Sequence, residues 1–329
     1  MIRKYLRSAR RKIFRFFNRL RFNKLLTQAN AQDKVIVMVL IPGLVHLAIP
    51  AIRLLGNRYT LIIINNGLNE SEKNCLCSSI TSIRLFKLYT NRFSGIQMVD
   101  THPEVIETLT GTDCNHMIFI DADCYVFDES LITKVFDQLT TNLFVSPFWF
   151  ENQQIKQKVP ETFLLGLDIA KLKKLKQKYN IRFGDSNLSS SLRKLAEEKW
   201  GRPVPWLQPW KKVYDTIHIP VIAGLVENMS SYFIETKCGD IYHVCGTSYN
   251  HNSFSLNTTV DGYIINAHYF HLRIIEVLDS KTLNQHFFSL IKNYGDSEGL
   301  KTMFPEYTNS NLHAQVEELI KKLKVLNLI

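Results

Sequence analysis

Apolar residues between positions 35 and 120 fall into short uninterrupted runs, and segments with a helical apolar period separate these runs. Uninterrupted runs are typical of buried strands, because a strand that is covered on both faces needs no polar positions. The predicted elements are strands over 35–41, 59–64, 95–99 and 116–120, and helices over 44–56, 71–88 and 103–109. Alternating strands and helices predict an α/β fold with a mostly parallel sheet flanked by helices.

The second half of the chain has a less regular pattern. Its predicted elements are strands over 143–150, 162–167 and 260–272, helices over 169–179 and 185–199, and an amphipathic helix close to the C-terminus. We therefore divide the chain into an arm over 1–30, one domain over 31–280 and a helical extension over 281–329.

The N-terminal segment 1–24 is strongly basic, with ten Lys or Arg and no acid. At about 100° per residue, its apolar positions fall within about 100° of arc, which predicts a basic amphipathic helix. These positions are Ile2, Leu6, Ala9, Ile13, Phe16, Phe17 and Leu20. An anionic membrane surface suits both faces of such a helix, so we expect a cytoplasmic protein held peripherally at a membrane. Docking on the protein's own body, a dimer contact and nucleic-acid binding are the alternatives.

The net charge of +10 comes from this arm alone. Subtracting its ten cations from the total of forty leaves thirty, which equals the thirty acids over 25–329. A neutral body argues against nucleic acid as a partner, because nucleic-acid-binding domains carry basic surfaces. The six cysteines form no CxxC pair, and this is typical of reduced thiols rather than of a disulfide framework.

The segment MIFIDADCYVFDE, from Met117 to Glu129, places Asp121 and Asp123 directly after an apolar strand. Two carboxylates this close repel each other unless a cation neutralises them, and hard oxygen ligands suit Mg²⁺ or Mn²⁺. Ligands of open α/β sheets bind at the carboxyl ends of the strands, where this segment lies. The first strand is followed by neither GxGxxG nor GxxxxGKS, so the phosphate loops of dehydrogenases and P-loop enzymes are absent.

From 35 to about 128, and in outline over 140–275, the chain resembles nucleotide-sugar-dependent glycosyltransferases of the GT-A fold, in which a DxD motif ends a central strand. The resemblance implies a hexosyl- or related glycosyltransferase. Residues 31–130 would bind the nucleoside-diphosphate sugar, with a UDP-sugar as the favoured donor. Residues 131–280 would bind a glycan, lipid or small-molecule acceptor. Asp123 would bind Mn²⁺ or Mg²⁺, and Asp121 would contact the ribose, the metal or both.

The resemblance also implies roles for residues outside the DxD motif. Asn65 and Asn66 stand where these enzymes often contact the base. His268 or His271 would add a third metal ligand, with Arg273 available to bind phosphate. In an extended segment these two histidines point to opposite faces, so only one of them could reach the metal, and we prefer His268.

Asp185, in RFGDSNLSSSL, is the expected base that takes a proton from the acceptor hydroxyl if the enzyme inverts the sugar linkage. An Asp at this place is equally well explained as the N-cap of the helix that follows. Two other activities are compatible with the motif: a nucleotidyltransferase of related fold and a DxD phosphatase.

Overall fold

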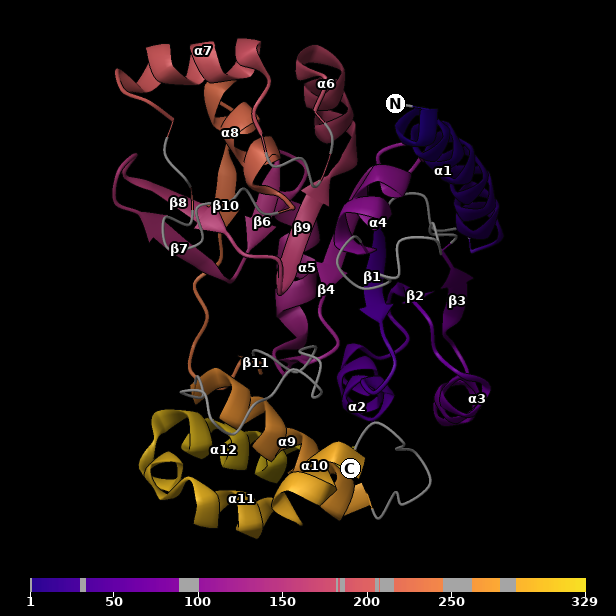
Figure 1. Ribbon diagram of the computed structural model, residues 1–329, viewed down its shortest axis with the longest axis vertical. Helices are drawn as coiled ribbons and strands as arrows, with labels where there is room; N and C mark the ends of the chain where they lie inside the picture. Colours follow the sequence, from indigo (N-terminus) through magenta and orange to yellow (C-terminus); the bar gives the residue numbers. More distant parts are fainter. Residues whose placement is uncertain are drawn as a thin grey trace.

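A computed structural model describes residues 2–29, 34–88, 101–181, 183, 187–204, 207, 216–244, 262–278 and 288–329. Its main feature is a seven-stranded sheet of order β10-β6-β9-β4-β1-β2-β3 (Figure 1). These strands are β1 (Lys34–Leu40), β2 (Thr60–Asn65), β3 (Arg84–Lys87), β4 (His116–Ile120), β6 (Phe144–Ser146), β9 (Leu164–Asp168) and β10 (Ser231–Phe233). Every neighbouring pair is parallel except those that involve β9, which runs antiparallel to β4 and β6. The predicted mostly parallel α/β sheet is confirmed.

The central strand β1 shows why its apolar run is uninterrupted. Successive side chains of a strand point to opposite faces, and β1 divides its residues between two separate cores. Ile36, Met38 and Leu40 pack in one core, whereas Val35 and Val37 pack in the other. All five are fully buried. The sheet is therefore covered by helices on both faces.

Each face of the sheet has its own helices. One core includes residues of α2 (Val45–Leu55), α3 (Glu70–Ser79), α5 (Glu129–Gln138), α9 (Gly262–Leu278), α10 (Phe288–Tyr294), α11 (Ser297–Met303) and α12 (Asn311–Val325). The other includes residues of α1 (Ile2–Gln28), α4 (Thr101–Leu109), α6 (Ile169–Tyr179), α7 (Ser190–Trp200) and α8 (His218–Val226). A 3-10 helix, η3 (Pro305–Asn309), precedes α12. None of the described helices is long and apolar enough to cross a membrane.

Two small sheets complete the described part of the chain. The hairpin of β7 (Trp149–Asn152) and β8 (Gln157–Pro160) is one, and the antiparallel pair of β5 (Cys124–Val126) and β11 (Ile241–His243) is the other. The second pair lies where β4 ends, between the main sheet and the C-terminal helices (Figure 1). This position brings residues from three parts of the chain to the carboxyl end of β4.

Three sequence predictions about secondary structure are wrong. The segment 260–272 is not a strand, because Gly262–Leu278 forms helix α9. The helix predicted over 71–88 ends at Ser79 and is followed by β3. The helix predicted from Asp185 begins only at Ser190, where the Ser189 hydroxyl caps it by accepting from the Leu192 amide. The strand predicted over 95–99 lies outside the described residues.

Candidate active site

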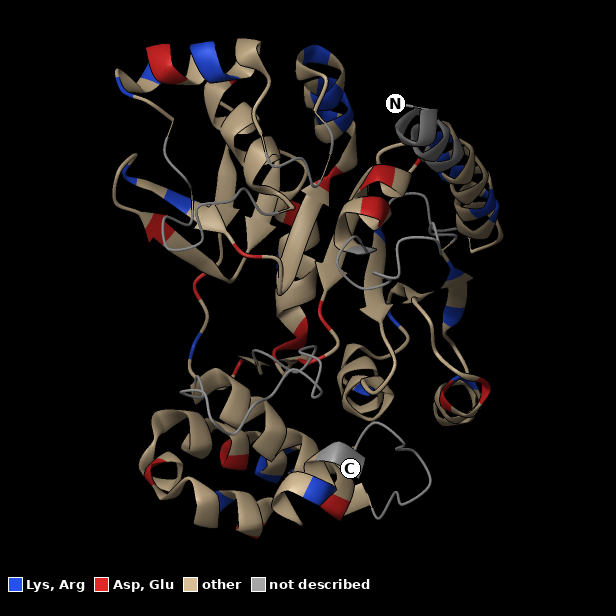
Figure 2. Cartoon of the chain, viewed as in Figure 1, with Lys and Arg blue, Asp and Glu red and all other residues tan. Residues whose placement is uncertain are grey.

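The two aspartates of the DxD segment lie in the turn that joins β4 to β5. The Asp121 amide donates to the Phe163 carbonyl oxygen at 2.9 Å, and the Cys124 amide donates to the Asp121 carbonyl oxygen at 3.2 Å. The first bond extends the pairing of β4 with the start of β9, and the second closes a short turn directly after Ile120, so both aspartates lie at the carboxyl end of β4. Figure 2 shows acidic residues in the chain that follows β4, next to the C-terminal helices.

Strand β11 places a histidine beside these carboxylates. His243 lies opposite Cys124 in the β5–β11 pair, and the Val244 amide donates to the Asp123 carbonyl oxygen at 3.2 Å. The His243 Nε2 atom lies 3.4 Å from Asp123 Oδ1 and 3.7 Å from Asp121 Oδ2. Its ring is stacked on Phe163, with 3.7 Å between the ring centroids and 19° between the planes. The ring is therefore held in place by a strand pair and by an aromatic neighbour.

Asp121, Asp123 and His243 form a group whose ligand atoms all lie within 4.8 Å of one another. Two carboxylate oxygens and one imidazole nitrogen are donors that suit Mn²⁺, and the carboxylates also suit Mg²⁺. Asp123 and His243 are almost fully buried, with side-chain exposures of 8% and 6%. The donor set and its spacing fit one divalent cation.

The nearby carboxylates of Asp121 and Asp123 repel each other, which disfavours the charged form of Asp121. Burial and repulsion by Asp123 raise the pKa of Asp121 to about 7, and His243 acts in the opposite direction. Another histidine, His102 at the start of α4, has its Nε2 atom 3.9 Å from Asp121 Oδ1. A carboxylate with a raised pKa beside a second carboxylate is a frequent property of functional sites. A bound cation would lower that pKa again.

A cavity of about 380 Å³ adjoins the group, and His243 is part of its wall. Segment 236–244 forms one side of this cavity, and Val316 and Glu318 of α12 contribute to another. Through His243, the group therefore adjoins a cavity whose wall also includes the C-terminal helix α12. A second cavity of about 290 Å³ lies elsewhere, at the junction of α1, α4 and α6.

Asn65 ends β2, the neighbour of β1 in the sheet, and Asn66 follows it directly. The Asn65 Oδ1 atom accepts from the amides of Gly67 and Leu68 at 3.1 and 2.9 Å, so this side chain shapes the turn. Asn66 is buried, and its amide donates to the Leu40 carbonyl oxygen. Both asparagines thus lie at the carboxyl end of a strand, as the sequence predicted, and their contact with a base stays a prediction.

The residues expected near the C-terminus of the domain lie elsewhere. His268 and His271 are buried in α9, where the His268 Nδ1 atom lies 3.1 Å from the Tyr294 hydroxyl oxygen. The His271 Nδ1 atom lies 3.2 Å from Nε2 of His46. Neither belongs to the group with Asp121 and Asp123.

His243, and neither of these two histidines, lies beside the two carboxylates. The expectation assumed an extended segment, but a helix directs their side chains into the packing of α2 and α10. Among the described residues, the site does not include His268 or His271 as a third donor.

Arg273 and Asp185 also need comment. The Arg273 guanidinium donates to Glu317 at 3.2 Å and to Glu276 at 2.9 Å, so two carboxylates of the C-terminal helices already hold this cation. This pairing does not favour the expected phosphate contact. Asp185 lies outside the described residues. Its role as a base stays a prediction.

Sequence reasoning missed His243, His102 and Glu161. Glu161 interacts with His243, and burial raises the pKa of this acid. The only signal for His243 was its place in the short strand-like segment before Val244. Nothing in that segment indicated that it would pair with the strand after the DxD turn.

Residues 16–172 match the family described as the StrH glycosyltransferase N-terminal domain. The matched range includes the DxD turn, so this part of the chain is similar to a glycosyltransferase domain. The crystal structure of the glycosyltransferase GlyE from Streptococcus pneumoniae TIGR4 is similar, with 14% identity and a TM-score of 0.37. The similarity covers 88% of this chain and 64% of that chain, so this chain spans about 64% of the length of GlyE. No curated protein matches the sequence.

Proposed function

We propose that this protein transfers a sugar from a nucleoside-diphosphate sugar to an acceptor hydroxyl, and that Asp121, Asp123 and His243 bind the divalent cation that the reaction uses. One observation carries the proposal: two carboxylates and an imidazole converge at a strand end, within 4.8 Å of one another and beside a cavity. The glycosyltransferase domain matched over 16–172 contains both carboxylates. The cation would be Mn²⁺ or Mg²⁺, and the imidazole donor favours Mn²⁺.

A cation at this place would offset the negative charge that develops on the nucleoside diphosphate as it leaves, which is worth several kcal/mol. The chain's own residues prepare that role. The β4–β5 turn fixes the positions of Asp121 and Asp123, and stacking on the Phe163 ring holds the His243 imidazole beside their carboxylates. Because Asp121 keeps its proton up to about pH 7 when no cation is bound, binding of the cation would release a proton at lower pH.

The donor and acceptor follow from the resemblance to nucleotide-sugar-dependent enzymes. We propose a UDP-sugar as the donor, with its base near Asn65 and Asn66 at the end of β2. A glycan, a lipid or a small molecule would supply the acceptor hydroxyl, and Asp185 would accept its proton if the linkage is inverted. The wall of the cavity beside His243 includes α12, so the C-terminal helices would contribute to substrate binding.

An anionic membrane surface is the proposed partner of residues 1–24, and it would place the enzyme peripherally at the cytoplasmic side of a membrane. The observations that support this partner are the ten cations without an acid and four apolar side chains that α1 leaves half exposed. Liposome binding with and without residues 1–24 tests this part of the proposal independently of sugar transfer.

The test of sugar transfer uses a panel of isotopically labelled nucleotide sugars with Mn²⁺ or Mg²⁺, and it measures thermal stabilisation and transfer. We expect at least one nucleotide sugar to raise the unfolding temperature only when the metal is present. Asp123→Asn should abolish this stabilisation and the transfer while the variant stays folded. Asp137→Asn, which removes an exposed carboxylate of α5, is the matched control and should behave like the wild type.

The same assay separates the alternative activities. A phosphatase would release labelled phosphate, and a nucleotidyltransferase would join the nucleotide rather than the sugar to a second substrate. Unchanged transfer by Asp123→Asn would contradict the proposed metal site. Labelled phosphate as the only product would contradict sugar transfer.

A further inference from the structure

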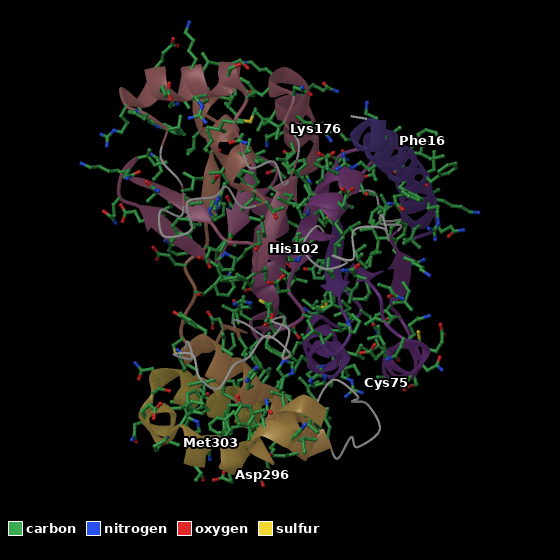
Figure 3. The ribbon with its side chains drawn as sticks, viewed as in Figure 1. Phe16, Cys75, His102, Lys176, Asp296 and Met303 are labelled. Carbon is green, nitrogen blue, oxygen red and sulfur yellow. The ribbon has the colours of Figure 1, made fainter. Side chains whose placement is uncertain are left out.

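The outer face of α1 carries a stripe of apolar side chains, formed by Ile13, Phe16, Phe17 and Leu20. Each of these side chains is between 52% and 55% exposed. Residues three and four positions apart lie on the same side of a helix, so the four form one continuous surface. We call it the outer stripe, and Figure 3 shows Phe16 on α1. Aromatic and aliphatic side chains gathered in this way mark an interaction surface.

The opposite side of α1 packs on the protein itself. Phe22 and Leu26 are buried, and the Phe22 ring meets Phe86 edge-on with 5.0 Å between the centroids. Arg15 donates two hydrogen bonds of 2.8 Å to the Glu104 carboxylate of α4. Docking of the helix on the body, one of the alternatives considered from the sequence, is therefore real. It uses the inner side and leaves the outer stripe exposed.

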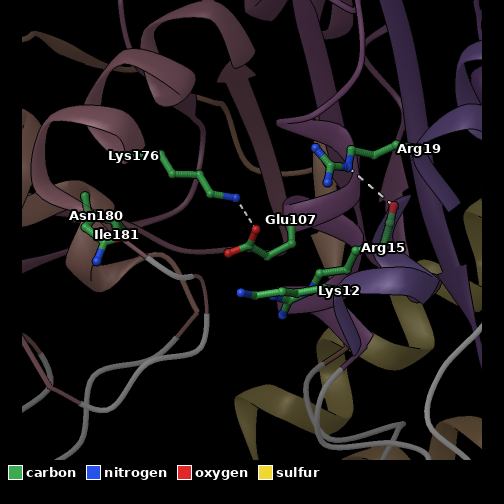
Figure 4. Close-up of a pocket in the computed structure, with 7 residues that line it drawn as sticks. All are labelled: Lys12, Arg15, Arg19, Glu107, Lys176, Asn180 and Ile181. Atoms are coloured by element: carbon green, nitrogen blue, oxygen red, sulfur yellow. Dashed lines mark hydrogen bonds and ion pairs between the residues drawn. The ribbon is translucent and has the colours of Figure 1, made fainter. Parts of the chain in front are cut away.

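A basic cavity lies next to the outer stripe. It has a volume of about 290 Å³, and its wall includes Lys12, Arg15 and Arg19 of α1 and Lys176 of α6 (Figure 4). Lys12 lies one helical turn before Phe16, so the cavity and the stripe adjoin. Figure 2 shows basic residues along both α1 and α6.

The cavity keeps a positive charge after its ion pairs are counted. Lys176 pairs with Glu107, which also lines the cavity, and Arg15 pairs with Glu104. Among the side chains that the structure describes here, four cations against these two carboxylates leave two positive charges in excess. A phosphate group with one or two negative charges matches that excess, because guanidinium and ammonium groups bind phosphate oxygens through charge-assisted hydrogen bonds.

We infer that this cavity holds the phosphate of an anionic phospholipid while the outer stripe inserts among the lipid chains beside it. The inference rests on the membrane partner proposed above and adds a site for the head group. A lipid combines the two features that the surface requires, since its phosphate lies directly next to its apolar chains. A soluble phosphate compound would satisfy the cavity but would leave the outer stripe in water.

The experiment measures binding of the full chain to phosphatidylcholine vesicles with and without phosphatidylglycerol. Each lost cation should weaken binding to the anionic vesicles about fivefold, so Lys12→Ala with Arg19→Ala should weaken it roughly 30-fold. Phe16→Ser with Phe17→Ser should weaken it at least about tenfold. The matched controls are Lys194→Ala and Leu195→Ser on α7, whose side chains are also exposed. Both controls should bind like the wild type.

Arg19 packs against Gly111, so Lys12→Ala is also measured alone. Lys12 is exposed, and its loss should still weaken binding about fivefold without a change in the unfolding temperature. If Lys12→Ala and the double variant bind like Lys194→Ala, the head-group site is wrong. Excess inorganic phosphate should compete for the cavity and weaken vesicle binding more than chloride does at equal ionic strength, and equal effects of the two salts would also overturn the inference.

The outcomes separate this inference from the two proposals it accompanies. If only the variant of Phe16 and Phe17 binds the vesicles more weakly, the membrane partner is confirmed and the head-group site is wrong. If the wild type does not bind anionic vesicles, both the membrane partner and the head-group site are wrong. Sugar transfer to a water-soluble acceptor uses residues at the other end of the sheet, so it stands or fails regardless of the vesicle result.

Discussion

Asp121→Asn should make the cation-free protein more stable at neutral and higher pH. In the folded protein Asp121 keeps its proton up to about pH 7, because its side chain is only 21% exposed and lies beside Asp123, whereas its ordinary pKa is 3.8. In the unfolded chain this carboxyl group therefore loses its proton at a pH several units lower than in the folded protein. Each pH unit between the two values costs the folded state about 1.4 kcal/mol, so the total reaches about 4 kcal/mol above pH 7. An Asn side chain has nearly the same size and carries no such cost.

The sign of the pH dependence follows from the direction of the change. Below about pH 4 the aspartate is protonated in both states, so wild type and variant should have similar stability. Between about pH 4 and pH 7 the folded wild type binds more protons than the unfolded chain, so its free energy of unfolding should fall as the pH rises. The variant lacks this fall.

Urea unfolding in the presence of EDTA, at about pH 4 and about pH 8, measures both free energies. Asp137→Asn is the control for loss of an acid at the surface, since its side chain is 62% exposed. Adding Mn²⁺ at the higher pH should stabilise the wild type and not the Asn variant, because the cation binds the folded state through Asp121. A difference between wild type and variant that stays the same at both pH values would refute the reasoning.

Three further tests, which use five variants, address other parts of the structure. His243→Ala should weaken Mn²⁺-dependent transfer at least about tenfold. His271→Ala should lower the unfolding temperature and leave the metal dependence unchanged. The opposite pattern would support a histidine of α9 as the metal ligand, as the sequence predicted. Phe22→Ala should lower the free energy of unfolding by about 3 kcal/mol and Phe16→Ala by less than about 0.5 kcal/mol, as urea titration would show, since only the inner side of α1 is packed. Gly166→Val should cost about 1–3 kcal/mol by the same assay, because even a Cβ atom at this position of β9 would lie 2.6 Å from a side-chain atom of α5; an unchanged midpoint would contradict this close packing.

The central strands could be predicted from the sequence because each is an uninterrupted apolar run buried on both faces. The runs predicted at 35–41, 59–64 and 116–120 differ from β1, β2 and β4 by at most one residue at either end. The edge strand β3 has no such run, since Arg84 and Lys87 interrupt it and only Phe86 is buried. A half-exposed strand of four residues after a helix therefore appeared as a continuation of that helix.

Helix α9 shows the opposite difficulty. Every residue from Ile265 to Leu272 is buried, so the segment has neither the helical period of an amphipathic helix nor the alternation of a half-buried strand. Periodicity alone cannot separate a buried strand from a helix that is covered all round. Only the C-terminal helices, which cover α9, decide between the two, and their packing is a property of the tertiary structure.

In the candidate site, too, one part could be predicted from a local sequence pattern and another part depends on the tertiary structure. Asp121 and Asp123 are neighbours in sequence, so one strand-end turn is enough to bring them together, and their mutual repulsion predicts the need for a cation and for further donors. The identity of the third donor depends on β11, a strand of three residues that pairs with β5 from more than one hundred positions away. A single histidine in a short strand carries no pattern that marks it as a ligand. The charge of the aspartates can thus predict that a partner is needed, while only the pairing of two strands places His243, and not a histidine of α9, beside them.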